Sequence, residues 1–258
     1  MNNQGLTFQH IRFDLGQDPT SPLRINPHEI HVWGFLLDIS ESELTVATQF
    51  LSDDEQERIH RLSSDRHRQH RIAAHAGLRL LLGRYSETLS GQLVIQKTPA
   101  GKPFLQNRPS VRFNLTHSHG RALIAITKDR EVGIDLEKVR LDVDVVRLAQ
   151  RFLSAQDQLF IERGDQNRRH ERFLKAWVAR EAVFKAAGTG LTFPLSDDHL
   201  ELIDDGTAGR LILGRSGEAK PVRFLALEPG WVGAVSSEGN NWTTTYPRWA
   251  ESDISQGM

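Results

Sequence analysis

One helix constrains this fold more than any other segment, because its apolar face contains two charged side chains. With residues about 100° apart around a helix axis, the segment 173–185 places five large apolar side chains on one arc: Phe173, Leu174, Trp177, Val178 and Phe184. Glu181 and Lys185 fall inside the same arc. A charge on a buried or half-buried face is costly unless it is paired or bound to a metal ion. The fold must therefore bring partners for Glu181 and Lys185 from elsewhere in the chain.

An earlier carboxylate pair, in the segment Gly133-Ile134-Asp135-Leu136-Glu137, can supply part of this need. Residues two apart on a strand face the same side about 6.6 Å apart, so Asp135 and Glu137 can hold one hard cation while Leu136 faces the core. Oxygen ligands in a chain without cysteine favour Mg²⁺, or Mn²⁺, over zinc. Because Mg²⁺ usually shares its coordination shell with substrate phosphates, a phosphate-bearing ligand is expected.

The same residues also allow a purely structural interpretation. Asp135 and Glu137 would then face solvent from their strand, and Glu181 would pair with Lys185 at i,i+4. For an isolated carboxylate pair this is the more common situation. The position of Glu181 within the apolar arc favours the metal site, with Asp135, Glu137 and Glu181 as its ligands.

Composition limits the classes of partner. The 258 residues are 38% hydrophobic and 25% charged, as in an ordinary soluble globular protein. The net charge of -1 argues against binding to nucleic acid, since such proteins usually carry a clear positive excess. The first five residues lack the pattern of a signal peptide, and no apolar stretch reaches the length of a membrane span. A cytoplasmic protein without a membrane partner is expected.

Helix and strand signals alternate along the chain and predict an α+β fold. Ser52-Asp53-Asp54-Glu55 is a capping box that opens one helix, and Ser64-Asp65 caps a longer one that runs to about Thr88. Further helices are expected at 143–152, 155–163 and 170–187. Strands are expected at 31–37, 93–96, 111–116 and 122–127, in a segment ending at 137, and at 199–203, 210–213, 222–227 and 231–235. Residues 1–25 are polar and carry several prolines, which predicts an irregular lead-in.

The polar joint Lys128-Asp129-Arg130 separates two strand segments and is the predicted domain boundary. It divides the chain into 1–128 and 129–258. Each part contains a few strands and one long helix, which suggests two related halves, although no repeat of residues is visible.

The long helix of the first half carries a ridge of basic side chains. Four of them lie within about 80° of one another around the axis: Arg68, Arg71, His75 and Arg79. A charged strip is usually a solvated face, but four like charges repel one another unless an anion lies against them. Both interpretations carry equal weight from the sequence.

Two further segments carry groups that can bind phosphate oxygens. One is the strand end and turn Phe113-Asn114-Leu115-Thr116-His117-Ser118-His119-Gly120, and the other is the turn Gly101-Lys102-Pro103. Taken alone this signal is weak, because Thr and His at a hairpin end more often satisfy local backbone groups.

Taken in order, these segments resemble the motifs of the 4′-phosphopantetheinyl transferase superfamily. The likeness rests on Gly101-Lys102-Pro103, Phe113–Ser118, Gly133–Glu137, and Trp177-x-x-Arg180-Glu181-Ala182-x-x-Lys185 with Gly188-x-Gly190-Leu191, and it spans about residues 51–191. It points to the monomeric, surfactin-synthetase-activator type. That type implies two pseudo-symmetric halves, each a small, mostly antiparallel sheet packed on a long helix, with the active site between them.

The resemblance implies transfer of the 4′-phosphopantetheine arm of coenzyme A to a serine of an acyl or peptidyl carrier protein, with release of adenosine 3′,5′-bisphosphate. In this sequence, Asp135, Glu137 and Glu181 would hold Mg²⁺ on the coenzyme A diphosphate, and Lys185 would neutralise the same group. Glu181 and Lys185 would thus be the catalytic residues. The substrate-binding set would be Lys102, Thr116 and His117 at the nucleotide, with Arg68, Arg71 and His75 near its phosphates.

Two residues depart from the pattern of the family: Arg180 stands where lysine is usual, and Thr116 where serine is usual. Arginine cannot accept a proton, so Glu181 or a metal-bound hydroxide is the better candidate base. His75, if relatives carry arginine there, would bind phosphate more weakly at high pH. Two alternatives stay open: a non-catalytic module that binds coenzyme A or a carrier protein, and a Mg²⁺-dependent phosphohydrolase.

Overall fold

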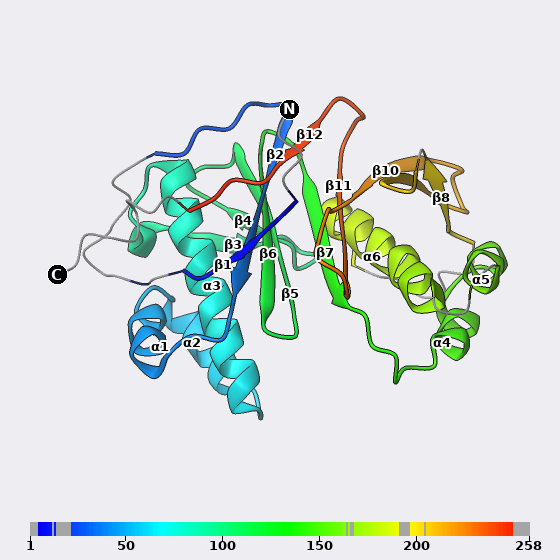
Figure 1. The fold of residues 1–258 in the computed structure, drawn as a ribbon. Helices are drawn as coiled ribbons and strands as arrows, with labels where there is room; N and C mark the ends of the chain where they lie inside the picture. Colours follow the sequence, from blue (N-terminus) through cyan, green and yellow to red (C-terminus); the bar gives the residue numbers. More distant parts are fainter. Residues whose placement is uncertain are drawn as a thin grey trace.

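The computed structural model describes residues 5–11, 13, 22–163, 165, 168–190, 197–203 and 205–249. Two five-stranded sheets lie side by side, and each carries one long helix (Figure 1). The predicted α+β class is therefore confirmed. The pseudo-symmetry of the two halves stays a prediction, and Leu191 of the glycine motif lies outside the described residues.

The first sheet is built mainly from the N-terminal half. Its order is β1 (Phe8–Gln9), β2 (Glu29–Leu36), β6 (Arg121–Lys128) and β5 (Val111–Ser118), and β12 (Thr243–Thr245) also pairs with β2. The pairs β2–β6 and β6–β5 are antiparallel, whereas β1 and β12 run parallel to β2. Helix α3 (Asp65–Ser86) shares a buried core with this sheet through Leu81, Phe113 and Ile124. Because β12 joins this sheet, the end of the described chain returns to the first half.

The second sheet is antiparallel throughout. Its order is β7 (Val132–Lys138), β11 (Trp231–Ser237), β10 (Ala219–Phe224), β9 (Ala208–Ile212) and β8 (His199–Ile203). Helix α6 (Arg169–Ala187) packs along β7 and β11, and α4 (Val145–Phe152) and α5 (Ala155–Glu162) lie against α6 (Figure 1). Buried alanines on α6, such as Ala176 and Ala179, let the helix approach the sheet closely.

Shorter elements complete the first half. Helices α1 (Glu41–Thr48) and α2 (Asp53–His60) pack against α3, and a 3₁₀ turn η1 (Ser90–Gln92) precedes the hairpin of β3 (Ile95–Lys97) and β4 (Pro103–Leu105). The predicted helices and strands are confirmed with shifts of a few residues at their ends, including the capping box at Ser52 and Glu55. The sequence interpretation missed α1, although Ser40 and Glu43 form a second capping box there. It also missed β1 and β12, because they are too short to show a period.

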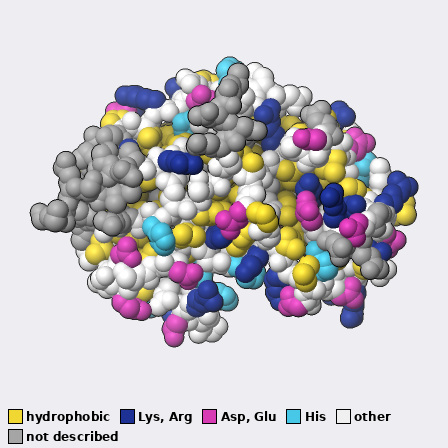
Figure 2. All heavy atoms as spheres, in the orientation of Figure 1, with side chains coloured by type: hydrophobic (Ala, Val, Ile, Leu, Met, Phe, Trp, Pro, Cys, Tyr) yellow, Lys and Arg dark blue, Asp and Glu magenta, His cyan; other side chains and the backbone are white. Residues whose placement is uncertain are grey.

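The two sheets meet where β5 lies beside β7. The backbone N–H of Ile134 on β7 donates to Asn114 Oδ1 on β5 over 2.9 Å. An apolar cluster continues this contact on both sides of the junction, with Leu123 and Val32 from the first sheet and Val235 from the second. No helix in the described part of the chain is long and apolar enough to cross a membrane. On the face drawn in Figure 2, acidic and basic side chains are interspersed, in keeping with the near-neutral net charge.

A glycine allows β7 and α6 to touch. A Cβ atom added to Gly133 would lie 2.0 Å from the carbonyl oxygen of Ala182 and 2.3 Å from the backbone nitrogen of Ala186. Both are helix backbone atoms, which cannot move aside without displacing α6. Gly133 therefore sets the distance between the strand that carries Asp135 and the helix that carries Lys185.

We expect Gly133→Ala to lower the free energy of unfolding by about 3 kcal/mol, the upper range for overpacking a close contact. Urea denaturation of the purified variant measures this loss. Gly91→Ala is the control, because a Cβ there meets no atom within 4 Å, and it should leave stability nearly unchanged. Equal stability of the two variants would contradict the role assigned to Gly133.

Candidate functional site

Strand β5 supplies hydroxyl partners to the carboxylates of β7. Thr116 Oγ1 donates to Asp135 Oδ1 over 3.0 Å, and Ser118 Oγ donates to Glu137 Oε2 over 3.1 Å. Thr116 and Ser118 are two residues apart on their strand, as are the two carboxylates on theirs, so the four side chains face one another in register. Asp135 is buried, with 4% of its surface exposed. The first half of the chain thus completes the surroundings of the carboxylates in the second.

Helix α6 adds the two charges that were found inside its apolar arc. Lys185 Nζ lies 2.6 Å from Asp135 Oδ1 and 3.9 Å from Glu181 Oε2. Since one ammonium group reaches both oxygens, Asp135 and Glu181 are near neighbours. Lys185 also lies 3.5 Å from Thr116 Oγ1. The structure therefore gathers three other predicted site residues around Lys185: Thr116, Asp135 and Glu181.

The carboxylates of this cluster repel one another. Burial, followed by the negative charges of Asp135 and Glu181, raises the pKa of Glu137 against the opposing effects of Ser118 and Lys185. Burial also raises the pKa of Glu181; the charge of Lys185 opposes this rise and that of Asp135 adds to it. Lys185 therefore does not balance all three carboxylates, and a further cation would lower the free energy of the group.

One oxygen of the cluster has no partner. Asp135 Oδ2 is buried and accepts no hydrogen bond, which is costly for a carboxylate. Among the described residues, no three His, Cys, Asp or Glu side chains form a ready-made metal cage. Mg²⁺ does not require one, because it binds through one or two carboxylates and completes its shell with waters and substrate phosphates. The donor set thus fits a divalent cation that arrives with a phosphate ligand.

Positive side chains lie next to the carboxylates. His117, at the exposed end of β5, has its pKa lowered to about 4, first by desolvation among the surrounding protein atoms and then by the charges of Arg71, His75, His70 and Lys185. These groups must be close together to act on one imidazole. Among the described residues, Arg71 has no ion-pair partner. Arg71 and His75 therefore place basic side chains beside His117, and this basic region borders the carboxylate cluster.

Comparison with known proteins accounts for both halves of the chain. A model of the 4′-phosphopantetheinyl transferase N-terminal region matches residues 38–129, and a model of the 4′-phosphopantetheinyl transferase superfamily matches residues 131–235. The 4′-phosphopantetheinyl transferase HetI of Nostoc sp. is 34% identical over 63% of this chain and 70% of its own length. This chain belongs to the 4′-phosphopantetheinyl transferase superfamily.

Two further relatives extend the match over more of the chain. The putative 4′-phosphopantetheinyl transferase slr0495 of Synechocystis sp. is 29% identical over 80% of this chain and 82% of its own length. The 4′-phosphopantetheinyl transferase Sfp of Bacillus subtilis is 25% identical over 79% of this chain and 90% of its own length. The predicted family is confirmed. Because these relatives are named as transferases, membership of the family favours the catalytic interpretation over the non-catalytic binding module.

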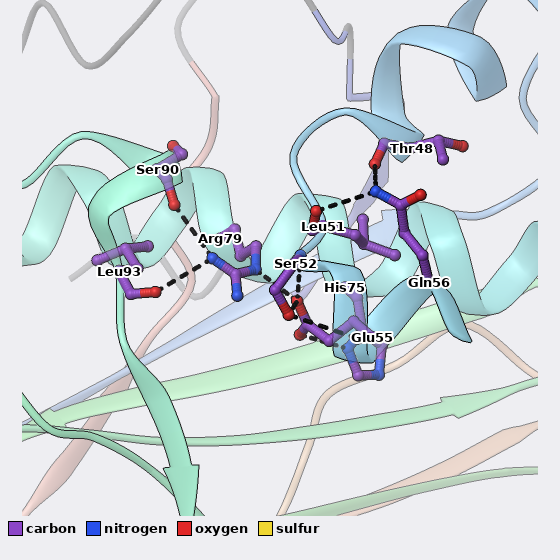
Figure 3. Close-up of polar contacts among 9 residues, drawn as sticks. All are labelled: Thr48, Leu51, Ser52, Glu55, Gln56, His75, Arg79, Ser90 and Leu93. Atoms are coloured by element: carbon purple, nitrogen blue, oxygen red, sulfur yellow. Dashed lines mark hydrogen bonds and ion pairs between the residues drawn. The ribbon is translucent and has the colours of Figure 1, made fainter. Parts of the chain in front are cut away.

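Within the transferase, the basic ridge of α3 is divided between different tasks. Glu55, from the capping box of α2, lies between His75 and Arg79 (Figure 3): its carboxylate is 3.2 Å from His75 Nδ1 and 2.8 Å from Arg79 Nε. Burial raises the pKa of Glu55, but hydrogen bonds from His75 and Ser52 and the charge of Arg79 outweigh it and lower the pKa to about 2. The internal carboxylate of Glu55 therefore relieves part of the repulsion among these basic side chains.

Arg79 and Arg68 are both engaged with the protein. Arg79 is buried and also donates to the carbonyl oxygens of Ser90 and Leu93 (Figure 3). Arg68 pairs with Asp65 and donates to the carbonyl oxygen of Leu62. Two members of the predicted ridge, Arg71 and His75, lie close enough to His117 to lower its pKa, which places them beside the site.

Lys102 ties the first half of the transferase to the second. Its Nζ donates to Glu131 Oε2 over 2.5 Å, to the carbonyl oxygen of Ala186 over 2.6 Å and to that of Val132 over 3.3 Å. Its side chain is only 11% exposed. A cation at the C-terminal end of a helix stabilises the last carbonyl groups. These acceptors occupy the three N–H donors of Lys102, so its predicted contact with the nucleotide would need one of these bonds to open.

Arg180 points away from the carboxylates and into the core of the second half. It is fully buried and pairs with Asp157, which is fully buried too. It also donates to the carbonyl oxygens of Ala176 and Asp198. Asp157 in turn accepts from Ser154, the N-cap of α5. Arg180 therefore joins α5 and α6 to the start of β8, and its side chain is not placed for proton transfer at Glu181.

We expect Arg180→Lys to lower the free energy of unfolding by about 2 kcal/mol, because an ammonium group cannot reproduce several guanidinium hydrogen bonds in a buried pair. The pH dependence of transfer should keep its shape. Thermal unfolding and a pH–rate profile measure the two effects. Arg61→Lys is the control, since Arg61 pairs with Glu57 on the surface. A pH profile that changes in Arg180→Lys alone would overturn this structural role.

An apolar pocket of about 300 Å³ borders Glu137 in the transferase. Its lining includes Val145, Leu148 and Phe152 on α4, Trp177 on α6, and His119 in the turn after β5. The sequence analysis did not single out this pocket, although three of these residues follow the spacing of an amphipathic helix on α4.

Proposed function

We propose that this chain transfers the 4′-phosphopantetheine arm of coenzyme A to a serine hydroxyl of an acyl or peptidyl carrier protein and releases adenosine 3′,5′-bisphosphate. One observation carries this proposal: Lys185 and the carboxylates of Asp135, Glu137 and Glu181 form a single cluster around the buried Asp135, in a chain whose two halves both match the transferase family. The basic region adjoins this cluster, as a diphosphate substrate requires.

Asp135, Glu137 and Glu181 would hold Mg²⁺, with Mn²⁺ as an alternative, and the ion would supply positive charge to the diphosphate. This assignment rests on the unpartnered Oδ2 of Asp135 and on the raised pKa values of Glu137 and Glu181. Arg71, His75 and His117 would bind the nucleotide phosphates. Arg68, Lys102 and Thr116 complete the predicted binding set, but their present hydrogen bonds give them a mainly structural part.

The proposed reaction is a displacement at phosphorus. The serine oxygen bonds to the phosphorus that carries the pantetheine arm, and the bond from that phosphorus to the bridging oxygen breaks. The bridging oxygen leaves with the electron pair as part of adenosine 3′,5′-bisphosphate, where the ammonium group of Lys185 stabilises its growing charge. The serine proton passes to Glu181, whose raised pKa suits a general base. A monomer acting in the cytoplasm on a fatty-acid, polyketide or peptide synthase carrier completes the proposal.

We expect Asp135→Ala and Glu181→Ala each to reduce transfer more than about a hundredfold, because each removes a carboxylate that would hold the cation acting on the diphosphate. Labelling of a carrier protein with a fluorescent coenzyme A analogue measures transfer. Glu171→Ala is the control on the same helix, since Glu171 lies in the first turn of α6, is half exposed and forms an ion pair with Lys175. Full activity of Glu181→Ala at ordinary magnesium would remove the basis of the assignment.

The same assay separates the proposed transfer from other reactions. Label on the carrier serine shows a transferase, whereas release of free phosphopantetheine without a carrier would show a phosphohydrolase.

Magnesium should shift the acid limb of the rate profile. The deprotonated carboxylates are the active forms, and the raised pKa values of Glu137 and Glu181 place their protonation above the ordinary value of 4.5. A cation favours the charged forms, so the limb should move to lower pH as magnesium rises. Initial rates from pH 5 to 8 at low and saturating magnesium test this. A limb that stays at the same pH would contradict a shared carboxylate site.

A further inference from the structure

The turn between β5 and β6 contains a histidine where the backbone favours other residues. Its two central residues, His119 and Gly120, have φ of +45° and +79°, the pattern of a type I′ hairpin turn. Asn-Gly and Asp-Gly are the usual residues there, because Asn, Asp and Gly adopt positive φ most readily. Histidine is also among the residues that adopt positive φ more often, so the turn accommodates His119, and its role must be judged from its hydrogen bonds.

The hydrogen bonds of His119 lead to a carboxylate of the site. His119 Nδ1 lies 2.9 Å from Ser118 Oγ, and Ser118 Oγ donates to Glu137 Oε2 over 3.1 Å. A hydroxyl has one proton. Because Ser118 gives this proton to Glu137, it must accept the hydrogen bond from His119, whose ring then carries its hydrogen on Nδ1. The three side chains form a chain of donors that ends on Glu137.

The surroundings of His119 favour the neutral form of its ring, which has one N–H. Desolvation, and then the positive charges of Lys138, Arg140 and Arg66, lower its pKa, against the opposing charge of Asp142. In the neutral imidazole the choice between Nδ1–H and Nε2–H decides the direction of the hydrogen bond, and the donor role of Ser118 requires Nδ1–H. His119 and Glu137 also line the same apolar pocket, so the hydrogen-bonded chain lies along its wall.

We infer that His119 is a positioning residue of the transferase: through Ser118 it fixes the direction in which the Glu137 carboxylate presents its free oxygen to the metal ion. This inference rests on the proposed function, because it assigns Glu137 to the ion. Hydrogen bonds to the groups that ligate a metal typically change its affinity ten- to a hundredfold. His119 is exposed, which places the expected effect at about tenfold.

Two substitutions separate the hydrogen bond from the turn. His119→Gly suits a positive φ and removes the donor. His119→Asn suits it equally well and puts an amide N–H in the position of Nδ1. Binding of Mn²⁺ to the full chain with coenzyme A, followed by electron paramagnetic resonance, should be about tenfold weaker for His119→Gly. For His119→Asn it should stay within about twofold of the original protein. Thermal unfolding should show both variants folded.

Ser118→Ala tests the middle of the hydrogen-bonded chain. It should weaken Mn²⁺ binding as much as His119→Gly does, and the double variant should be no weaker than either single one, because both changes remove one shared interaction. Additive losses would overturn the inference, and so would equal losses in His119→Gly and His119→Asn. Nitrogen NMR of His119 should show the hydrogen on Nδ1; a hydrogen on Nε2 would also overturn it.

The outcomes distinguish this inference from the proposed function. If the original protein labels the carrier and binds Mn²⁺, and His119→Gly binds Mn²⁺ equally well, only the role of His119 is lost. If the original protein neither binds Mn²⁺ nor labels a carrier, the proposed function is lost as well.

Discussion

The buried ion pair between Lys185 and Asp135 is the interaction on which the rest of the site depends. Asp135 is almost wholly covered, and an unpaired carboxylate there would strongly destabilise the fold. The pair can form only if α6 lies directly against β7, and Gly133 makes that distance available because it places no side chain between them. Two residues of one strand thus fix both the packing of the helix and the position of the charge, so that site and fold share one constraint.

The site also requires the two halves to be docked. Asn114, Thr116 and Ser118 on β5 are alternate residues of one strand, and they contact Ile134, Asp135 and Glu137 on β7 in the same order. Lys102 adds a tie from the first half to the last turn of α6, one residue beyond Lys185. Neither half would present a complete set of groups alone. The candidate site therefore lies at the junction between the two sheets and not on a loop of one of them.

Local physics explains what the sequence could predict. Capping boxes and apolar periodicity act within a few residues, so α2, α3 and α6 were placed correctly, as was the pairing of β5 with β6. The cluster at Lys185 was predicted because a charge within an apolar arc must find a partner. The roles of three side chains could not be predicted in this way, because their partners are distant in the sequence: Glu55, Lys102 and Arg180. Glu55 looked like a helix cap alone, yet it also neutralises His75 and Arg79. No local sequence pattern shows that Asp157 forms a buried ion pair with Arg180.

The partners of Lys185 suggest why the free protein tolerates so many charges in one place. The ammonium group neutralises Asp135 and lies near Glu181, while Glu137 accepts a hydrogen bond from Ser118 and has a raised pKa. A diphosphate that binds here brings new negative charge and needs Lys185 for itself. The carboxylates can release Lys185 only if another cation replaces it, so substrate and metal should each favour the binding of the other. If the proposed function holds, the ion pair that stabilises the site would therefore also couple the binding of diphosphate to that of the metal.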